Sequence, residues 1–154
     1  MAELEAEAIV HRVVHGGSRF DGAVVVDDEV EAAIEELVPL APLHQPRALS
    51  LIRASRRSDR PVVACFDTSY HRTIPPAAAT YALPAEWRDR FGLRKFGFHG
   101  LSHEYVGRTV EARRVVSCHL GAGASLCAIA DGVSVDTTMG FTPVDGRVMA
   151  TRGC

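Results

Sequence analysis

Strand-like segments of this chain are joined in two different ways, and this spacing constrains the fold more than any other feature. Residues 124–130 and 133–137 are separated only by Asp131-Gly132, a pair that favours a tight β-hairpin turn. Residues 9–15 and 62–66 are separated by a long stretch with helical patterns, as a crossover between parallel strands requires. Hairpins and crossovers together predict an α/β fold with mixed sheets and flanking helices.

Helical segments are marked by caps and by apolar spacing. Asp27 and Asp28 are good N-cap residues, and the apolar side chains that follow them recur every three or four positions. Similar reasoning predicts helices over 48–57, over 84–90 with Gly92 as its end, and over 103–111 with Ser102 as its N-cap. Residues 94–98 are expected to form a brief strand, and residues 115–120 a longer one.

Asp67 directly follows the apolar strand 62–66. A carboxylate at the end of a buried strand is costly unless it has a partner or a function, and strand ends in α/β sheets are where ligands bind. Asp67 is therefore a candidate site residue that could orient a metal or a catalytic water. The alternatives are that it pairs with an arginine or caps the turn near Thr68.

Two arginines are candidates for binding an anion. Arg12 lies inside an otherwise apolar strand, and Arg152 stands beside Gly153, which would let a ligand approach closely. The competing interpretation for each is a surface salt bridge, which contributes only ~0–1 kcal/mol.

The strand 115–120 leads into Gly121-Ala122-Gly123. Such a turn exposes backbone N–H groups that can bind phosphate oxygens without a lysine. A hairpin follows it rather than a helix, so neither the dinucleotide-binding fingerprint nor the Walker loop fits. The alternative is a simple tight hairpin connection.

Seven histidines raise the question of a metal site. Two pairs are four residues apart, but His11 and His15 lie on a predicted strand, and His99 precedes the predicted helix of His103. We therefore predict no zinc site and no metal ligands. His99 and His119 fit better as hydrogen-bond donors to an anionic substrate.

Composition and charge exclude several classes of protein. The chain is 47% apolar and 23% charged, with a net charge of −2. These values are typical of a globular domain, and without a basic tract they argue against nucleic-acid or membrane-surface partners. No apolar run is long enough to span a bilayer, and the acidic start has no signal-peptide core. The cysteines form no Cys-x-x-Cys pair, so a cytoplasmic location is expected.

Eight segments, in order along the chain, resemble motifs of the acetate kinase family, which includes propionate and butyrate kinases. The segments are His11-Arg-Val-Val-His-Gly-Gly17, Leu40-Ala-Pro-Leu-His44, Phe66-Asp-Thr68, Tyr81-Ala-Leu-Pro84, Lys95-Phe-Gly-Phe-His-Gly-Leu-Ser-His103, Cys118-His-Leu-Gly-Ala-Gly123, Ser134-Val-Asp-Thr-Thr-Met-Gly-Phe-Thr-Pro143 and Thr151-Arg152. The resemblance extends from about Val10 to Arg152.

This resemblance implies a phosphotransferase that moves the γ-phosphoryl group of ATP to acetate, or a similar short carboxylate, and forms acetyl phosphate reversibly. It implies part of an actin/hexokinase/Hsp70-like ATPase fold, with Mg²⁺ as cofactor and a homodimeric assembly. Residues 1–72 would be the end of the first lobe, on the substrate side. Residues 73–154 would be the start of the second lobe, with the phosphate-binding hairpin.

The resemblance also implies roles for individual residues. Asp67, Arg152 and His99 would be catalytic, with His99 hydrogen-bonding the phosphoryl oxygens. Arg12 would bind the substrate, and His44 would lie near its acetyl group. The residues of the phosphate-binding hairpin would be His119, Leu120, Gly121, Ala122 and Gly123.

The sequence departs from the family at several points. Val10 stands where the family has glycine, and Ala122 replaces the asparagine of the phosphate turn. The family's opening Asn-x-Gly-Ser-Ser-Ser turn and its later acidic and adenosine-binding stretches have no counterpart in these residues. We therefore expect the fold to be incomplete at both ends and the activity impaired. The alternatives are a non-catalytic fragment that binds phosphate or a partner, a propionate kinase and, less in keeping with the residues, a histidine-rich metal hydrolase.

Overall fold

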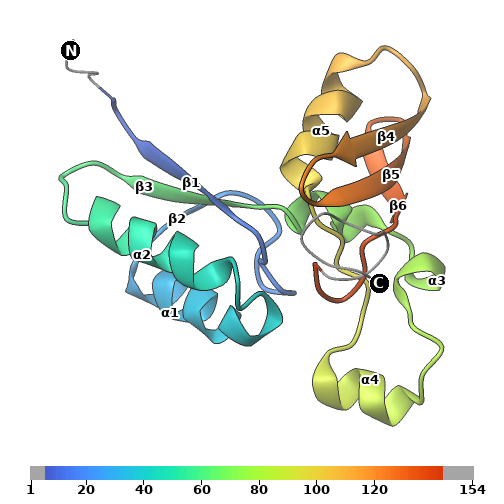
Figure 1. The fold of residues 1–154 in the computed structure, drawn as a ribbon, viewed down its shortest axis with the longest axis horizontal. Coiled ribbons are helices and arrows are strands. Elements are labelled where there is room, and N and C mark those ends of the chain that lie inside the picture. The colour runs from blue at the N-terminus through green and yellow to red at the C-terminus, as the bar shows by residue number, and fades with distance from the viewer. Residues whose placement is uncertain (1–5, 144–154) are drawn as a thin grey trace.

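The computed structural model describes residues 6–143 and contains two separate three-stranded sheets (Figure 1). The elements, in chain order, are β1 (Ile9–Val13), β2 (Val24–Val25), α1 (Asp28–Glu36), the 3₁₀ helix η1 (Val38–Leu40), α2 (Gln45–Ser55), β3 (Val62–Phe66), the 3₁₀ helix η2 (Ser69–Thr73), α3 (Pro76–Ala79), α4 (Ala85–Phe91), α5 (Gly100–Thr109), β4 (Arg114–Leu120), β5 (Ala124–Ala130) and β6 (Val133–Thr137). None of the helices in this described part is long and apolar enough to cross a membrane.

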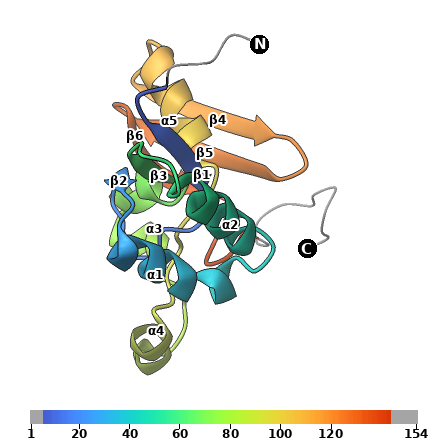
Figure 2. The ribbon, with the colours of Figure 1, turned by 90° about the vertical axis from the view of Figure 1, so that its left-hand side faces the viewer.

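The first sheet has the strand order β1-β3-β2, with β1 parallel and β2 antiparallel to β3. In both views α1 and α2 lie together beside this sheet (Figures 1 and 2). Ile34 of α1 and Ile52 of α2 are fully buried with Phe66 of β3, and the Phe66 ring stacks on Phe20 at 4.4 Å between centroids. Each such side chain contributes ~1.5–3 kcal/mol on burial, so this cluster holds the helices on the sheet.

The second sheet is an antiparallel meander with the order β4-β5-β6, and α5 packs against it. Asp131 and Gly132 connect β5 to β6 with φ angles of 48° and 82°. Positive φ at both positions is what the tight hairpin turn requires, so this prediction is confirmed. The sheets are linked through η2, whose His71 is fully buried and lies within hydrogen-bonding distance of Ser134 of β6. The division into lobes at residues 1–72 and 73–154 stays a prediction.

The expected start of α1 is also confirmed. The Asp27 side chain accepts a hydrogen bond of 2.8 Å from the Val30 N–H, which satisfies one of the unpaired donors of the first turn. At the end of α4, Gly92 adopts φ 61°, the left-handed conformation typical of a helix end.

The prediction of a strand over residues 94–98 is wrong. This segment pairs with no strand in the described part, and Gly97 has a φ of 74°. A Cβ at Gly97 would lie 2.6 Å from the ring of His71, so the chain bends where only glycine fits. Phe96 and Phe98 are buried, and this packing accounts for the alternating pattern that resembled a strand.

The predicted N-cap of the fifth helix is also wrong. Helix α5 begins at Gly100 rather than after Ser102, and His99 occupies the N-cap position with a φ of 56°. A Cβ on Gly100 would lie 1.9 Å from the backbone oxygen of Asp67. The first turn of α5 therefore rests directly on the end of β3, which brings His99 to the same place as Asp67.

Substitution of Gly100 by alanine is expected to lower the free energy of unfolding by ~1–3 kcal/mol, because the new methyl group would collide with backbone that cannot move aside easily. Gly22 is the matched control, since a Cβ there meets nothing within 4 Å. Gly22→Ala should change the free energy by no more than about 0.5 kcal/mol. Urea denaturation of both variants measures the difference, and equal losses would contradict the close packing of α5 on β3.

The burial of His15 predicts that the stability of the fold depends on pH. It is fully buried, its Nδ1 accepts a hydrogen bond from the Gly17 N–H, and burial lowers its pKa from 6.5 to about 4. Between those pH values His15 is protonated in the unfolded chain but neutral in the folded protein. Stability is therefore fully present above about pH 6.5 and falls by up to ~1.4 kcal/mol per pH unit below it.

His15→Asn is the variant that isolates this effect, because its amide oxygen replaces the Nδ1 acceptor without titrating. Urea unfolding between pH 4.5 and 7 should give a shallower slope for the variant than for the wild type. Parallel slopes would show that His15 does not stay neutral in the folded state.

Candidate active site

A cavity of about 530 Å³ lies where the ends of β1 and β3 face α5 and the β4–β5 hairpin. Its walls include predicted site residues from five separate parts of the chain, namely Arg12, His44, Asp67, His99, His119, Ala122 and Gly123. Leu120 and Gly121 do not line it, and Leu120 is largely exposed to solvent. Arg152 lies outside the described residues.

Arg12 and Asp67 form a two-point ion pair at the edge of this cavity. Parallel pairing of β1 with β3 places Arg12 opposite Cys65, and the Asp67 N–H donates to the Val13 carbonyl at 3.0 Å. Arg12 Nε donates to one carboxylate oxygen of Asp67 at 3.0 Å, and Nη2 donates to the other at 2.5 Å. Of the alternatives for Asp67, pairing with an arginine is the one observed.

Burial differs sharply between the two partners. The Asp67 side chain is 1% exposed, whereas the Arg12 side chain is 54% exposed. Hydrogen bonding to Asp67 raises the pKa of the Arg12 guanidinium, so it remains charged. The buried carboxylate thus holds the guanidinium at the cavity wall, with the other face of Arg12 open to an incoming anion.

His99 and His119 form a stacked pair on the opposite wall. Their ring centroids are 4.1 Å apart with 16° between the planes. Burial, followed by repulsion from His119, lowers the pKa of His99 to about 4, so His99 is neutral at pH 7. His99 Nδ1 lies 2.9 Å from Ser125 Oγ, and His119 Nδ1 lies 3.0 Å from Ser102 Oγ.

The glycine turn closes a hairpin between β4 and β5. The Gly121 N–H donates to the Gly123 carbonyl at 3.0 Å, so this amide is used within the turn. Ala122 and Gly123, rather than Gly121, present the turn to the cavity. The tight hairpin connection considered from the sequence is therefore present, and it also forms part of the cavity wall.

Sequence reasoning missed the residues that complete the walls. Val14, Phe98 and Met139 supply an almost fully buried apolar surface, while Ser102 lines the polar side. Ser125, which contacts His99, is buried on β5. A serine within an alternating strand carries no signal of such a partner, because that partner comes from a distant segment.

Within residues 6–143, no three His, Cys, Asp or Glu side chains are grouped so as to hold a metal ion. The described walls of the cavity contain a single carboxylate, that of Asp67.

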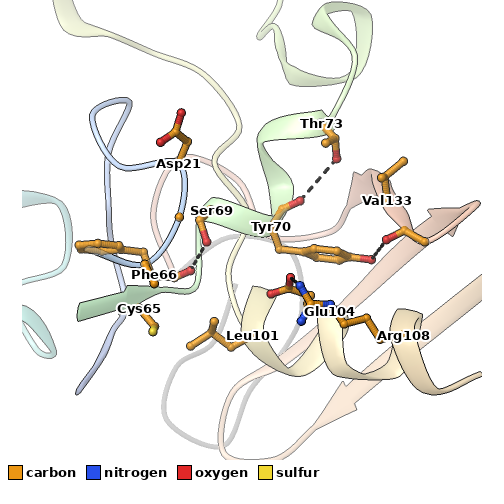
Figure 3. Close-up of a pocket in the computed structure, with 13 residues that line it drawn as sticks. Asp21, Cys65, Phe66, Ser69, Tyr70, Thr73, Leu101, Glu104, Arg108 and Val133 are labelled. Atoms are coloured by element: carbon orange, nitrogen blue, oxygen red, sulfur yellow. Dashed lines mark hydrogen bonds and ion pairs between the residues drawn. The ribbon is translucent and has the colours of Figure 1, made fainter. Parts of the chain in front are cut away.

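A second cavity, of about 590 Å³, shares only Leu101 with the first (Figure 3). Tyr70 and the Glu104–Arg108 ion pair line it. Burial raises the pKa of Tyr70 to about 12, so its hydroxyl stays protonated and donates to the Gly132 carbonyl at 3.0 Å. This cavity contains none of the residues predicted for the site.

Comparison with curated proteins finds acetate kinases among the relatives of this chain. The sequence model of the Acetokinase family matches residues 2–154. The acetate kinase of Staphylococcus epidermidis is 53% identical, over 92% of this chain and 36% of that protein. The acetate kinase of Thermotoga maritima is 49% identical, over 96% of this chain and 39% of that protein.

Solved structures agree with this placement. The crystal structure of a propionate kinase from Francisella tularensis superposes with a TM-score of 0.90 at 43% identity, covering 96% of this chain and 41% of that one. Acetate kinase from Porphyromonas gingivalis gives a TM-score of 0.87 at 39% identity, covering 96% of this chain and 40% of that one. The chain thus spans about two fifths of the length of these relatives.

The resemblance seen in the motifs and the α/β fold that it implied are both confirmed by these matches. Sequence identity near one half and superposition over almost the whole chain lead to one conclusion: this chain belongs to the Acetokinase family.

Proposed function

We propose that this chain contributes the acceptor side of an acetate kinase active site, which transfers the γ-phosphoryl group of ATP to acetate and forms acetyl phosphate and ADP reversibly. The observation that carries the proposal is the convergence of Arg12, Asp67 and His99 on one cavity. Relatives named acetate kinases match over nearly the whole chain, which supports the same reaction.

Arg12 is suited to bind the carboxylate of the substrate. Asp67 takes two of the five N–H donors of its guanidinium, so the others can reach an anion in the cavity. The apolar side chains of Val14, Phe98 and Met139 line the same cavity and would accept a short alkyl group. A small carboxylate with one polar and one apolar end fits these two surfaces.

The transferring phosphoryl group would lie between Arg12 and His99. Negative charge spreads over its equatorial oxygens in the transition state, so catalysis depends on positioning and on donors aimed at those oxygens. Neutral His99 can donate one hydrogen bond, and the hairpin residues Ala122 and Gly123 lie on the same wall. Arg152 stays the predicted second arginine by resemblance to the family.

Asp67 is suited to a place beside a divalent metal, which we propose to be Mg²⁺ carried with ATP. Magnesium is usually held by one or two carboxylates together with phosphate oxygens and water. Arg12 occupies two of about four acceptor positions on the carboxylate, so lone pairs remain that could face a metal ion. The bound ion would offset the negative charge of the phosphates. Resemblance to the family also supports a cytoplasmic homodimer that acts on small molecules rather than on nucleic acid or membranes.

Propionate is the second candidate acceptor, because a propionate kinase superposes on this chain with a TM-score of 0.90. An apolar pocket distinguishes acids that differ by one methylene by only ~1–3 kcal/mol, which is roughly 10–200-fold in kcat/KM. Steady-state kinetics with both acids would identify the preferred one, and we expect acetate.

Trapping with hydroxylamine tests the proposed reaction. The expressed protein that carries these residues, given ATP, Mg²⁺ and acetate, should accumulate acetyl hydroxamate. Omission of any one of the three should abolish the product. A folded protein that binds ATP or phosphate but forms no hydroxamate would instead support the non-catalytic phosphate-binding alternative.

Arg12→Ala is expected to lower the rate of hydroxamate formation by ~10³–10⁵, as for other arginines that stabilise phosphoryl transfer. Arg12→Lys should not restore the rate, because lysine lacks the planar two-point geometry that engages Asp67. Loss of the partner of a buried carboxylate also destabilises the fold, so circular dichroism must show that the variants are folded.

Arg53→Ala is the matched control. Arg53 is also ion-paired, to Glu31 and Glu35, but between α1 and α2 and away from the cavity. Its rate should equal that of the wild type. A folded Arg12→Ala protein with an unchanged rate would remove Arg12 from the site.

A further inference from the structure

A continuous chain of hydrogen-bonding groups leads from the core of the second sheet to His99. Ser117 Oγ lies 2.9 Å from His103 Nδ1, His103 Nε2 lies 2.8 Å from Ser125 Oγ, and Ser125 Oγ lies 2.9 Å from His99 Nδ1. Its inner members are sealed from water, since His103 and Ser125 are fully buried and Ser117 is 5% exposed. The three elements β4, α5 and β5 each supply a member.

Both rings of this chain carry a single proton at neutral pH. Burial is the largest cause that lowers the pKa of His99 to about 4 and that of His103 to about 3. A neutral imidazole has one donor nitrogen and one acceptor nitrogen, and a serine hydroxyl donates only once. The four groups must therefore be ordered. Ser125 Oγ could accept from both rings at once, but its hydroxyl would then have no acceptor among the described residues. Two fully connected directions remain.

In the first direction, protons point from Ser117 toward the cavity. The Ser117 hydroxyl donates to His103 Nδ1, His103 Nε2–H donates to Ser125, and the Ser125 hydroxyl donates to His99 Nδ1. Every buried donor then has an acceptor. The remaining proton lies on His99 Nε2, on the ring that lines the cavity.

In the opposite direction, His99 Nδ1–H donates to Ser125, and the order is reversed as far as Ser117. The Ser117 hydroxyl would then have to donate elsewhere, and no other residue of the described part offers it a hydrogen-bond acceptor. A buried donor without a partner is disfavoured by roughly 5–150-fold in population, so the first direction is favoured.

We propose that Ser125, His103 and Ser117 are positioning residues, which together fix His99 as the tautomer with its proton on Nε2 and so present a hydrogen-bond donor to the cavity. The catalytic role of this donor rests on the proposed function, because the donor would serve the phosphoryl oxygens. The test is independent of that function, since the tautomer of a histidine ring can be measured without turnover.

His71 shows the same arrangement elsewhere in the sheet. Its Nε2 lies 2.9 Å from the Phe98 carbonyl, which can only accept, so Nε2 carries the proton. Its Nδ1 must then accept from the Ser134 hydroxyl at 2.9 Å. In the favoured order, a buried serine of the second sheet therefore donates to Nδ1 of three histidines, His71, His99 and His103.

Long-range ¹H–¹⁵N correlation NMR of the labelled chain at pH 7 tests the proposal, because it distinguishes the two neutral tautomers of each histidine. Wild-type His99 should carry its proton on Nε2 in at least about a fivefold excess. Ser125→Ala removes the hydroxyl that donates to Nδ1, and the excess should fall to within about threefold. Ser102→Ala is the matched control, since the Ser102 hydroxyl lies within hydrogen-bonding distance of His119 and makes no hydrogen bond to His99, His103 or Ser125 among the described residues.

Ser117→Ala gives the sharper result and does not disturb the contacts of His99. It removes the hydroxyl at the far end of the hydrogen-bond network. If Ser117 had only a local structural role, the His99 tautomer would not change. The proposal predicts that the tautomer excess of both His103 and His99 falls. A wild-type His99 protonated on Nδ1, or a His99 tautomer unchanged in either Ser117→Ala or Ser125→Ala, would overturn it. Neither result depends on whether the protein forms acetyl phosphate.

Discussion

The ion pair between Arg12 and Asp67 is the interaction on which the arrangement of the site depends. The two residues are 55 positions apart and meet only because β1 and β3 pair in parallel with one particular register. A slip of one residue would turn Arg12 to the other face of the sheet and leave the Asp67 carboxylate buried without a cation. Such a charge costs several kcal/mol, ~3–5 when one partner is removed, so the pair penalises every other register.

The second sheet contributes polar groups where the first contributes an apolar core. Serines on β4, β5 and β6 are buried and lie within hydrogen-bonding distance of the rings of His71 and His103. Buried polar groups stabilise a fold only when every one of them has a partner, and a satisfied network admits few other arrangements. The close contact of Gly100 with the Asp67 carbonyl joins this network to the ion pair, so donors from one sheet and charges from the other face a single cavity.

Local patterns were enough to predict much of the fold. The turn at Asp131 and Gly132, the cap at Asp27 and the strand that ends before Asp67 each depend on neighbouring residues alone. The errors at residues 94–98 and at the start of α5 arose where distant contacts decide the backbone, because Gly97 makes room for His71 and Gly100 for Asp67. The same distinction holds for the site. Motifs indicated Arg12, Asp67 and His99, but nothing local indicates that Ser125 and His103 lie behind His99.

The central claim is that residues distant in the sequence bind one anion together. An NMR titration of the labelled chain with acetyl phosphate tests it most directly, with the signals of the Arg12 side chain and the His99 and His119 rings followed at each concentration. The account predicts that all three signals shift and saturate with one shared dissociation constant, while the side chain of Arg53 does not respond. Separate dissociation constants for Arg12 and the two histidines, or shifts at Arg53 equal to those at Arg12, would contradict a common site.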